Sequence, residues 1–442
     1  MKIAMIGTGY VGLVSGVCFS DFGHDVVCVD KNQEKLALLR AGKTPIFEPG
    51  LDDLMVRNIA AGRLSFTGDL KAASQDADAV FIAVGTPSRR GDGHADLSFV
   101  FSAVKEVAKV LTKPTVIVIK STVPVGTNQH VADILKDVRP DLHCDVVSNP
   151  EFLREGAAIN DFMYPDRVVV GVQSERGNQV MQEVYRPLAR RDHPILTTDL
   201  ETAEMIKYAA NAFLATKVTF INEIAMLCER TGADVKDVAN GMGFDSRIGP
   251  KFLQAGPGYG GSCFPKDTKA LARIGQDNAT PLQIVETVIK VNEEVKRLMI
   301  DKIVDLCDEK LRNKTITVLG LTFKPDTDDM RDAPALTVVP ALVGLGAHVR
   351  VVDPQAFREA EDLLPNVIWF EDVYEAVEGA DAVVLLTEWN EFRALDLRDM
   401  ASRMKSPRMA DLRNMYSCDY ALEAGFEAYT GMGRKSLLPH DR

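Results

Sequence analysis

Cysteine is scarce in this 442-residue chain, and its seven cysteines are scattered, with no CxxC pair among them. An odd, scattered set does not indicate a disulfide framework or a zinc cluster, so we predict no metal site. Unpaired thiols suit the reducing cytosol.

Long apolar runs are also missing, since none approaches the ~20 residues that span a bilayer. The first apolar strand follows Met1 and Lys2 directly, which leaves no room for the parts of a signal peptide. We therefore expect a cytoplasmic protein with no membrane association.

Positive charge is in deficit, because 51 Lys and Arg face 63 Asp and Glu, a formal net charge of -12. Such a field repels nucleic-acid phosphates and excludes a nucleic-acid partner. Anionic small ligands must then be held locally, by helix N-termini and a few Lys and Arg side chains.

The hydrophobic pattern divides the chain into three segments. In residues 1–198 short apolar runs alternate with helical stretches, which predicts a doubly wound parallel sheet of the Rossmann type. Residues 199–311 hold two long helices, from Asp199 to Gly232 and from Pro281 to Leu311, and predict a helical dimerisation domain. Residues 312–442 repeat the first pattern. The predicted fold class is therefore α/β, with two Rossmann-like domains joined by a long-helix connector.

Particular runs support this division. The strands expected in the first segment are KIAMIG, DVVCVD, AVFIAV, TVIVIK, CDVVS and DRVVVG. In the last segment we expect strands TITVLG and HVRVVD, with a helix over 334–345 between them, and an ADAVVL run that echoes ADAVFI of the first segment. The apolar stripe expected on the first long helix comprises Ile206, Ala210, Phe213, Val218, Ile221 and Ala225. A broad stripe of this kind often supplies the interface of a homodimer.

A glycine loop follows the first strand and opens a helix, in the order Gly7, Thr8, Gly9, Tyr10, Val11, Gly12. The glycines allow the turn, the approach of backbone to a pyrophosphate, and close helix packing. Asp30 ends the next strand, where a carboxylate would bind the ribose hydroxyls. The combination predicts a dinucleotide site, and the acid favours NAD over NADP because it would repel a 2′-phosphate.

Two later strands end in Gly85-Thr86-Pro87 and Ser121-Thr122-Val123-Pro124. The carboxyl edge of an open α/β sheet is where ligands sit, so Thr86 and Thr122 are expected to border the cofactor. Each run is equally compatible with a simple strand-ending turn.

Cys263 lies in the run GYGGSCFPKD, after a glycine-rich loop and before a helix expected to begin near Pro265. A thiol at a helix N-terminus with Lys266 nearby should have a lowered pKa, and the thiolate is the nucleophilic form. A small buried cysteine without chemistry is the alternative that spacing alone leaves open.

Further polar residues of the sequence are candidates for the same chemistry. Glu151 and Glu155 fall in a loop after the strand CDVVS, where one of them could act as a general base. Lys207 and Asn211, four apart in the first long helix, project from one face and could donate to a developing oxyanion. Solvent exposure is the alternative for Arg154, Glu155 and Lys207, whereas Glu151, between a proline and an apolar pair, is less ordinary.

The sequence resembles the UDP-glucose and GDP-mannose dehydrogenase family over essentially its whole length. The motifs GTGYVG, SNPEFLREG, KYAANAFLA, GYGGSCFPKD and GLTFKPDTDDMR stand in the family's order. The resemblance implies an NAD domain, a helical dimerisation segment and a nucleotide-sugar domain. It also implies oxidation of one C6 alcohol by two successive NAD, through a thiohemiacetal and a thioester on the cysteine.

The resemblance assigns roles to further residues. Water would hydrolyse the thioester with help from Glu151 or Asp267, while Lys207 and Asn211 stabilise charge on oxygen. The residues that it implies for NAD are Gly7, Gly9, Tyr10, Val11, Gly12, Asp30, Lys35, Thr86, Thr122, Glu155, Lys266 and Arg331. Those that it implies for the sugar nucleotide are Phe152, Leu153, Arg154, Glu155, Lys207, Asn211, Phe252, Leu253, Gln254, Ala255, Gly256, Gly260 and Lys324. Arg247 is similar to the family arginine that reaches the partner's site, and Thr122 joins the catalytic set.

Several alternatives remain open at this point. The run FLQAG before GYGGSCFPKD favours UDP-glucose as substrate, with GDP-mannose and UDP-N-acetylmannosamine as competitors. A two-electron β-hydroxyacid-type dehydrogenase would share the glycine loop and the long helix without needing Cys263. A non-enzymatic NAD sensor is a third possibility, which the presence of every candidate catalytic residue disfavours.

Overall fold

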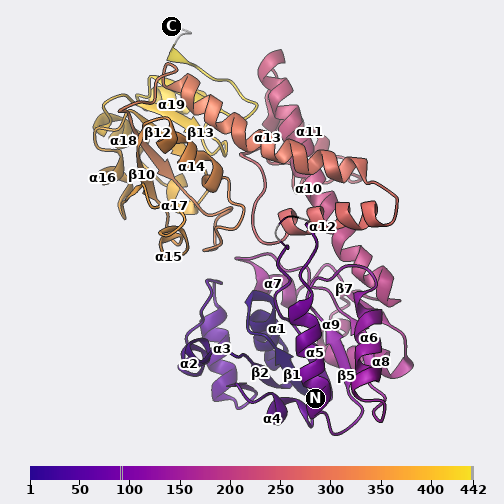
Figure 1. Cartoon of the computed structure of the whole chain (residues 1–442). Coiled ribbons are helices and arrows are strands. Elements are labelled where there is room, and N and C mark those ends of the chain that lie inside the picture. Colours follow the sequence, from indigo (N-terminus) through magenta and orange to yellow (C-terminus); the bar gives the residue numbers. More distant parts are fainter. Residues whose placement is uncertain (90, 92, 440–442) are drawn as a thin grey trace. The chain divides into compact units, whose positions relative to one another are not determined.

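The computed structural model describes residues 1–89, 91 and 93–439 of the chain (Figure 1). The chain forms two compact units. Met1–Ala210 and Arg273–Thr280 make the first, and Asn211–Ala272 and Pro281–Arg442 make the second. Within the described residues, no helix has the length and apolar character needed to cross a membrane. The division at 1–198, 199–311 and 312–442 stays a prediction.

The sheet of the first unit has the order β3-β2-β1-β4-β5-β6-β7-β8. Its strands are β1 (Lys2–Ile6), β2 (Asp25–Val29), β3 (Leu64–Thr67), β4 (Ala79–Ile82), β5 (Val116–Ile119), β6 (Asp145–Ser148), β7 (Val168–Val172) and β8 (Ile195–Thr198). All six predicted strands are confirmed, while β3 and β8 were not predicted.

The predicted parallel sheet has one exception, because β7 runs antiparallel to β6. Between them the chain forms a loop and the six-residue helix α7 (Ala158–Met163). A helix this short does not carry the chain back to the opposite edge of the sheet, as a parallel crossover requires. The chain therefore enters β7 from the edge at which β6 ends.

Alternation along the strands gives the first sheet two cores. In β1, Ile3 and Met5 belong to one buried cluster with α1 (Tyr10–Asp21), and Ala4 and Ile6 to another with α5 (Ser98–Val110) and α6 (Thr127–Val138). Successive side chains of a strand point to opposite faces, so a strand covered on both sides is apolar throughout.

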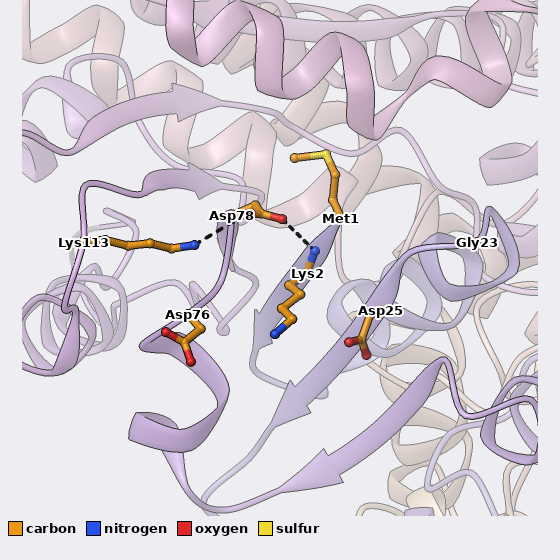
Figure 2. Close-up of a pocket in the computed structure, with 7 residues that line it drawn as sticks. All are labelled: Met1, Lys2, Gly23, Asp25, Asp76, Asp78 and Lys113. Carbon is orange, nitrogen blue, oxygen red and sulfur yellow. Dashed lines mark hydrogen bonds and ion pairs between the residues drawn. The ribbon is translucent and has the colours of Figure 1, made fainter.

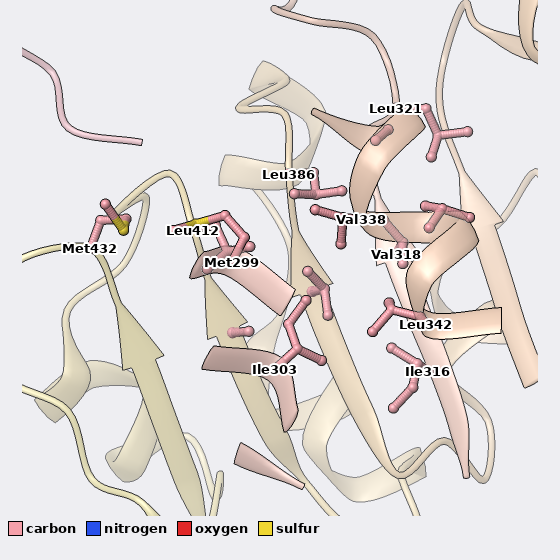
Figure 3. Packing of buried hydrophobic residues seen from close by; sticks show 14 of the residues in the cluster. Met299, Ile303, Ile316, Val318, Leu321, Val338, Leu342, Leu386, Leu412 and Met432 are labelled. Carbon is pink, nitrogen blue, oxygen red and sulfur yellow. The ribbon is translucent and has the colours of Figure 1, made fainter. Parts of the chain in front are cut away.

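The second unit contains a six-stranded sheet of order β11-β10-β9-β12-β13-β14, and each neighbouring pair is parallel. Its strands are β9 (Thr315–Leu319), β10 (His348–Val352), β11 (Ile368–Trp369), β12 (Ala382–Leu385), β13 (Arg408–Asp411) and β14 (Ala428–Gly431). The predicted second Rossmann-like fold is confirmed. Figure 3 shows its main core, where residues of α13 (Gln283–Leu306) and α14 (Ala335–Gly344) pack with those of β9.

The two Rossmann-like folds are similar in their hydrogen bonds as well as in their strand order. Asp30 after β2 accepts from the backbone N–H of Thr8 at 3.1 Å, and Asp353 after β10 accepts from Leu321 N–H at 2.6 Å. The glycine that ends the first strand of each fold has a positive φ, +98° at Gly7 and +85° at Gly320. The two aspartates therefore brace equivalent turns.

Both long connector helices begin close to their predicted positions. Helix α10 (Leu200–Thr231) ends before Gly232, whose φ of +78° suits a C-terminal cap. Helix α13 ends at Leu306, five residues before the predicted Leu311, because Asp308 and Glu309 both have φ near +57° and cannot continue a helix.

The predicted apolar stripe of α10 is only partly correct. Ile221 and Ala225 are buried, but Phe213 is 66% exposed. Lys207 and Asn211 are instead nearly fully buried, because tertiary partners satisfy their polar atoms. Polar residues therefore occupy part of the buried face of this helix.

Shorter helices complete the two folds. Those of the first unit are α2 (Gln33–Arg40), α3 (Leu51–Ala60), α4 (Leu70–Ser74), α8 (Glu175–Val184) and α9 (Arg186–Ala189). Those of the second unit are α11 (Val235–Gly243), α15 (Phe357–Ala360), α16 (Val373–Val377), α17 (Asn390–Arg393), α18 (Leu397–Arg403) and α19 (Cys418–Glu423). Helix α12 (Phe264–Asp277), like α10, contributes residues to both units.

Candidate active site

The glycine loop lies between β1 and α1, as its sequence predicts. A Cβ added at Gly12 would lie 2.0 Å from the carbonyl oxygen of Gly7, so only glycine fits there. A Cβ at Gly9 would meet nothing within 4 Å, and Gly9 caps α1 with no side-chain hydrogen bond. The first-turn N–H groups of α1 and the space above Gly9 therefore fit an anionic pyrophosphate.

Asp30 is held beside this loop. Its carboxylate accepts hydrogen bonds from Thr8 Oγ1 at 2.5 Å and from Asn32 N–H at 3.0 Å, and Lys35 Nζ lies 3.7 Å away. Burial alone would raise its pKa, but the hydrogen bonds from Asn32 and Thr8 bring the pKa of Asp30 below its ordinary value. The carboxylate is therefore ionised at neutral pH, which disfavours a 2′-phosphate.

Thr86 and Thr122 lie together at the carboxyl edge of the same sheet. Thr86 Oγ1 donates to the carbonyl oxygen of Thr122 at 3.0 Å, which joins the loops after β4 and β5. Their predicted place beyond the carboxyl ends of two strands of one sheet is confirmed, and their contact with a cofactor stays a prediction.

Glu48 is a residue of this site that sequence reasoning missed. Its buried carboxylate accepts the Tyr10 hydroxyl and the backbone N–H groups of Gly156, at 2.7 Å, and Ala158, at 2.8 Å. Burial and the Glu48 carboxylate raise the pKa of Tyr10 far above its usual range. Glu48 thus fastens the glycine loop to the loop that carries Glu151, and the only signal in the sequence is an acid set between Phe47 and Pro49.

Glu151 and Lys207 form a buried ion pair. Lys207 Nζ donates to Glu151 Oε1 at 2.9 Å, and the two side chains are 3% and 4% exposed. Leu153 N–H donates to the other carboxylate oxygen at 2.5 Å. Burial would raise the pKa of Glu151, but the charge and hydrogen bond of Lys207 bring it below its ordinary value. Exposure to solvent, the alternative for Lys207, is therefore wrong.

The rest of the 151–156 loop has a different character. Arg154 forms an ion pair with Asp161 at 2.6 Å, and its side chain is 53% exposed. Two cations lie over the Phe152 ring, with the Arg167 guanidinium 3.6 Å and Lys207 Nζ 5.3 Å from its centroid. Arg154 is therefore a surface residue, as its alternative interpretation predicts, whereas Lys207 is buried.

In the second unit, Cys263 immediately precedes helix α12. Its carbonyl oxygen accepts the first helical hydrogen bond, from Asp267 N–H at 2.8 Å, and its side chain is half-buried. Asp267 is fully buried, and its carboxylate accepts from Asn211 Nδ2 at 2.7 Å and Lys266 Nζ at 2.5 Å. Asn211 of α10 thus meets Lys266 and Asp267, which lie in the first turn of α12 after the cysteine.

The glycine-rich loop before Cys263 packs against the GLTFKPDTDDMR segment. A Cβ at Gly260 would lie 2.5 Å from the carbonyl oxygen of Asp332, and one at Gly261 would lie 2.7 Å from the Phe323 ring. Gly261 N–H also donates to Arg331 O at 2.8 Å. Two motifs more than fifty residues apart in the sequence therefore pack directly against each other. The sequence alone did not predict this contact.

The remaining predicted residues of this unit have separate environments. Phe252 has a left-handed φ of +64°, and Gly256 N–H donates to Asn222 at 2.9 Å. Lys324 lies over the Phe323 ring at 5.5 Å. Arg331 is held by Asp329 at 2.8 Å. The Arg247 side chain is 87% exposed and pairs with Asp245 at 2.5 Å.

Arg413 is a second residue that sequence reasoning missed. It donates from Nε to Leu386 O at 2.7 Å and from Nη2 to Phe323 O at 2.9 Å, and a Cβ at Gly256 would lie 3.2 Å from Nη1. Arg413 lies two residues after β13. The sequence indicated it only as an arginine just past the end of a short apolar run.

A hollow at the opposite, amino edge of the first sheet belongs to none of these groups (Figure 2). Lys2 and Asp25 begin β1 and β2 there, and Asp78 accepts from Lys2 N–H at 2.9 Å and pairs with Lys113 at 3.5 Å. Ligands of open α/β sheets sit outside the carboxyl ends of the strands, so this hollow does not compete as the candidate site.

Comparisons with known proteins agree with this arrangement. Residues 1–189 match the NAD binding domain of the UDP-glucose/GDP-mannose dehydrogenase family, residues 201–294 its central domain, and residues 317–418 its UDP binding domain. The three matches together cover most of the chain.

Individual relatives match along their whole length. The chain is 58% identical to a UDP-glucose 6-dehydrogenase of Rhizobium meliloti, over 98% of this chain and 100% of that one, and 46% identical to the UDP-glucose 6-dehydrogenase YwqF of Bacillus subtilis, over 99% of each. A solved UDP-glucose dehydrogenase structure from Pyrobaculum islandicum is 38% identical, with a TM-score of 0.91 over 98% of both chains.

Proposed function

The chain belongs to the UDP-glucose/GDP-mannose dehydrogenase family and is an NAD-dependent oxidoreductase acting on UDP-glucose, and we propose that it converts the C6 alcohol to a carboxylate through adducts on Cys263. One observation carries this proposal: Cys263 stands at the start of α12, beside a buried Asp267 held by Asn211 and Lys266. The N-terminal end of a helix favours the thiolate.

The cofactor supplies the hydride acceptor when it is bound. The glycine loop, which leads into the first turn of α1, and the ionised Asp30 fit the pyrophosphate and the adenosine ribose of NAD. The wider set that we propose for NAD is Gly7, Gly9, Tyr10, Val11, Gly12, Asp30, Lys35, Thr86, Thr122, Glu155, Lys266 and Arg331.

The first oxidation removes a hydride and a proton from the C6 alcohol and leaves an aldehyde. We assign the proton to the buried pair of Lys207 and Glu151, whose carboxylate is ionised at neutral pH and linked to the lysine at 2.9 Å. Asn211 and Thr122 are proposed to donate hydrogen bonds to the oxygen as its charge grows.

The second oxidation passes through the cysteine. The Cys263 thiolate adds to the aldehyde carbon, and the oxygen takes up a proton to form a thiohemiacetal. Loss of a second hydride from the same carbon, with the hydroxyl proton, gives a thioester. Water then adds to the thioester carbonyl, the C–S bond breaks, and the products are the acid and the free thiol. Glu151 or Asp267 accepts the proton of that water.

For the sugar nucleotide we propose a further set of contact residues. The residues are Phe152, Leu153, Arg154, Glu155, Lys207, Asn211, Phe252, Leu253, Gln254, Ala255, Gly256, Gly260 and Lys324. Arg247 is proposed to reach the site of a partner subunit, in keeping with its 87% exposed side chain.

A stoichiometric assay tests the reaction. NADH formation is followed with UDP-glucose, GDP-mannose and UDP-N-acetylmannosamine in parallel, and we expect two NADH per UDP-glucose consumed. Cys263→Ser should stop acid formation and still bind NAD. One NADH with a released carbonyl product, or acid formation by Cys263→Ala, would overturn the covalent route and favour a two-electron dehydrogenase.

We also propose a homodimer. Phe213, Phe220 and Leu227 of α10 lie seven residues apart along one helix face and are 66%, 45% and 57% exposed. Such a regular apolar strip is typical of an unpaired helix interface. In sedimentation velocity, Phe220→Asp should yield monomer where the wild type is dimeric, whereas Phe99→Asp, at an exposed site of α5, should not. A monomeric wild type would contradict the proposal.

We further propose a cytoplasmic location. None of the seven cysteines forms a disulfide in the structure, and a nucleophilic cysteine works only while it is reduced. Recovery of the native enzyme in a secreted or membrane fraction of its host would contradict this.

A further inference from the structure

Lys120 is a buried lysine that no step above uses. It follows β5 at the carboxyl edge of the first sheet, next to β6, whose following loop carries Glu151. The residue is 3% exposed. Its ammonium donates to Asn149 Oδ1 at 3.2 Å and to Tyr185 Oη at 3.4 Å, and it lies 5.8 Å from the centre of the Phe162 ring.

The partners of Lys120 are neutral. Among the described residues no carboxylate lies within ion-pair distance of it, although a buried ammonium normally requires such a partner. The titratable groups that face it are Glu151, Lys207, Cys18 of α1 and Tyr185 after α8. Burial raises the pKa of both Cys18 and Tyr185, so these two are uncharged at neutral pH. Glu151 is therefore the one anion that Lys120 faces among these groups.

Asn149 links Lys120 to Glu151 through the chain. Its side chain is fully buried and held by three hydrogen bonds: Oδ1 accepts from Lys120 and, at 2.7 Å, from Tyr185, while Nδ2 donates to Val169 O at 2.8 Å. Only Pro150 separates Asn149 from Glu151 in the sequence. An anchored Asn149 side chain therefore holds the backbone in place just before Glu151.

We propose that Lys120 is a positioning residue for Glu151, which anchors Asn149 and, together with Lys207, supplies the positive field that keeps Glu151 a proton-accepting carboxylate. This inference rests on the proposed role of Glu151 in the reaction. One buried carboxylate then has two ammonium groups, Lys207 in direct contact and Lys120 acting at longer range, besides the Arg167 guanidinium, which also interacts with it.

The ionisation of Lys120 agrees with this role. Burial lowers its pKa to about 8, while Glu151 opposes the shift and Lys207 adds to it. Lys120 is therefore mostly charged at neutral pH, and it loses its charge in moderately alkaline solution. The support that Glu151 receives from it should fade over the same range.

Two variants separate charge from hydrogen bonding. Lys120→Met removes the ammonium, and Tyr185→Phe removes a neutral donor to the same Asn149 oxygen. We expect Lys120→Met to move the acidic limb of the kcat profile up by roughly one pH unit, so that kcat on that limb falls roughly tenfold with little change in KM for UDP-glucose. Tyr185→Phe should leave the limb in place. An unmoved limb in a folded Lys120→Met protein would overturn the proposal.

A second measurement is independent of turnover. The Glu151 carboxyl band, identified by infrared difference against Glu151→Gln, should titrate at higher pH in Lys120→Met than in wild type. Lys120→Gln, which can still donate to Asn149, should give the same shift, and an unshifted band in either variant counts against the proposal. Failure of both neutral variants to fold would make the role structural and overturn the proposal. Absence of NADH formation by wild type would instead refute the proposed function, and the infrared titration would still test Lys120.

Discussion

Removal of the Lys207 ammonium should destabilise the loop that carries Glu151 far more than the loss of a surface ion pair. The two side chains are 3% and 4% exposed and their charged atoms lie 2.9 Å apart. Breaking a buried pair by removing one partner costs about 3–5 kcal/mol, whereas an exposed pair contributes about 0–1 kcal/mol. In Lys207→Met the carboxylate keeps the Leu153 N–H at 2.5 Å and the field of Lys120, so we expect the lower end of that range, about 3 kcal/mol.

The effect should depend on pH in a defined direction. The folded pKa of Glu151 is below its ordinary value, so the stability that the pair contributes is fully present above the unfolded carboxyl pKa of ~4.3. It is lost as pH falls through the folded pKa. The difference between wild type and Lys207→Met should therefore be largest near neutral pH and shrink in acid.

Native-state hydrogen exchange of residues 149–157 measures this local stability without assuming two-state unfolding of the whole chain. Lys31→Met, which breaks an ion pair with Glu106 whose side chains are 79% and 39% exposed, is the matched control and should change local stability by under about 1 kcal/mol. The double variant with Glu151→Gln should lose less than the sum of the single losses. A loss under about 1 kcal/mol in Lys207→Met, or strict additivity, would refute the reasoning.

Three further outcomes are expected. Gly261→Ala places a Cβ 2.7 Å from the Phe323 ring at a φ of +81°, so thermal unfolding should shift down by several degrees, and an unchanged midpoint would show that the loop relaxes freely. Asp30→Ala should raise KM for NAD roughly tenfold or more and narrow the preference over NADP, and unchanged cofactor kinetics would remove Asp30 from the site. The buried Glu204 carboxylate accepts from Gly126 N–H at 2.7 Å and Asn128 N–H at 2.8 Å, and Glu204→Gln replaces one of its oxygens by a donor. Hydrogen exchange in the first turn of α6 should then become faster, because the free energy of opening falls by about 1–3 kcal/mol. An unchanged exchange rate would show that water replaces the lost contact.

Much of the fold follows from local pattern. Apolar runs such as 116–119 and 382–385 are strands buried on every residue, and the two long connector helices fall where helical periodicity begins. The glycine loop and Asp30 were predictable for the same reason, since a turn, a helix start and a strand end are properties of neighbouring residues. Short edge strands such as β11, with two residues, carry too little pattern to be found this way.

The sequence by itself therefore determined the class of fold, the family, the cofactor loop and the identity of the cysteine motif. Tertiary structure alone decided which polar residues are buried and with whom. Lys207 and Asn211 look like ordinary surface residues of a helix, yet each meets a carboxylate 56 positions away, Glu151 and Asp267. Periodicity is set by neighbours in the chain, whereas the desolvation and pairing of a charge depend on side chains that only folding brings within a few ångströms.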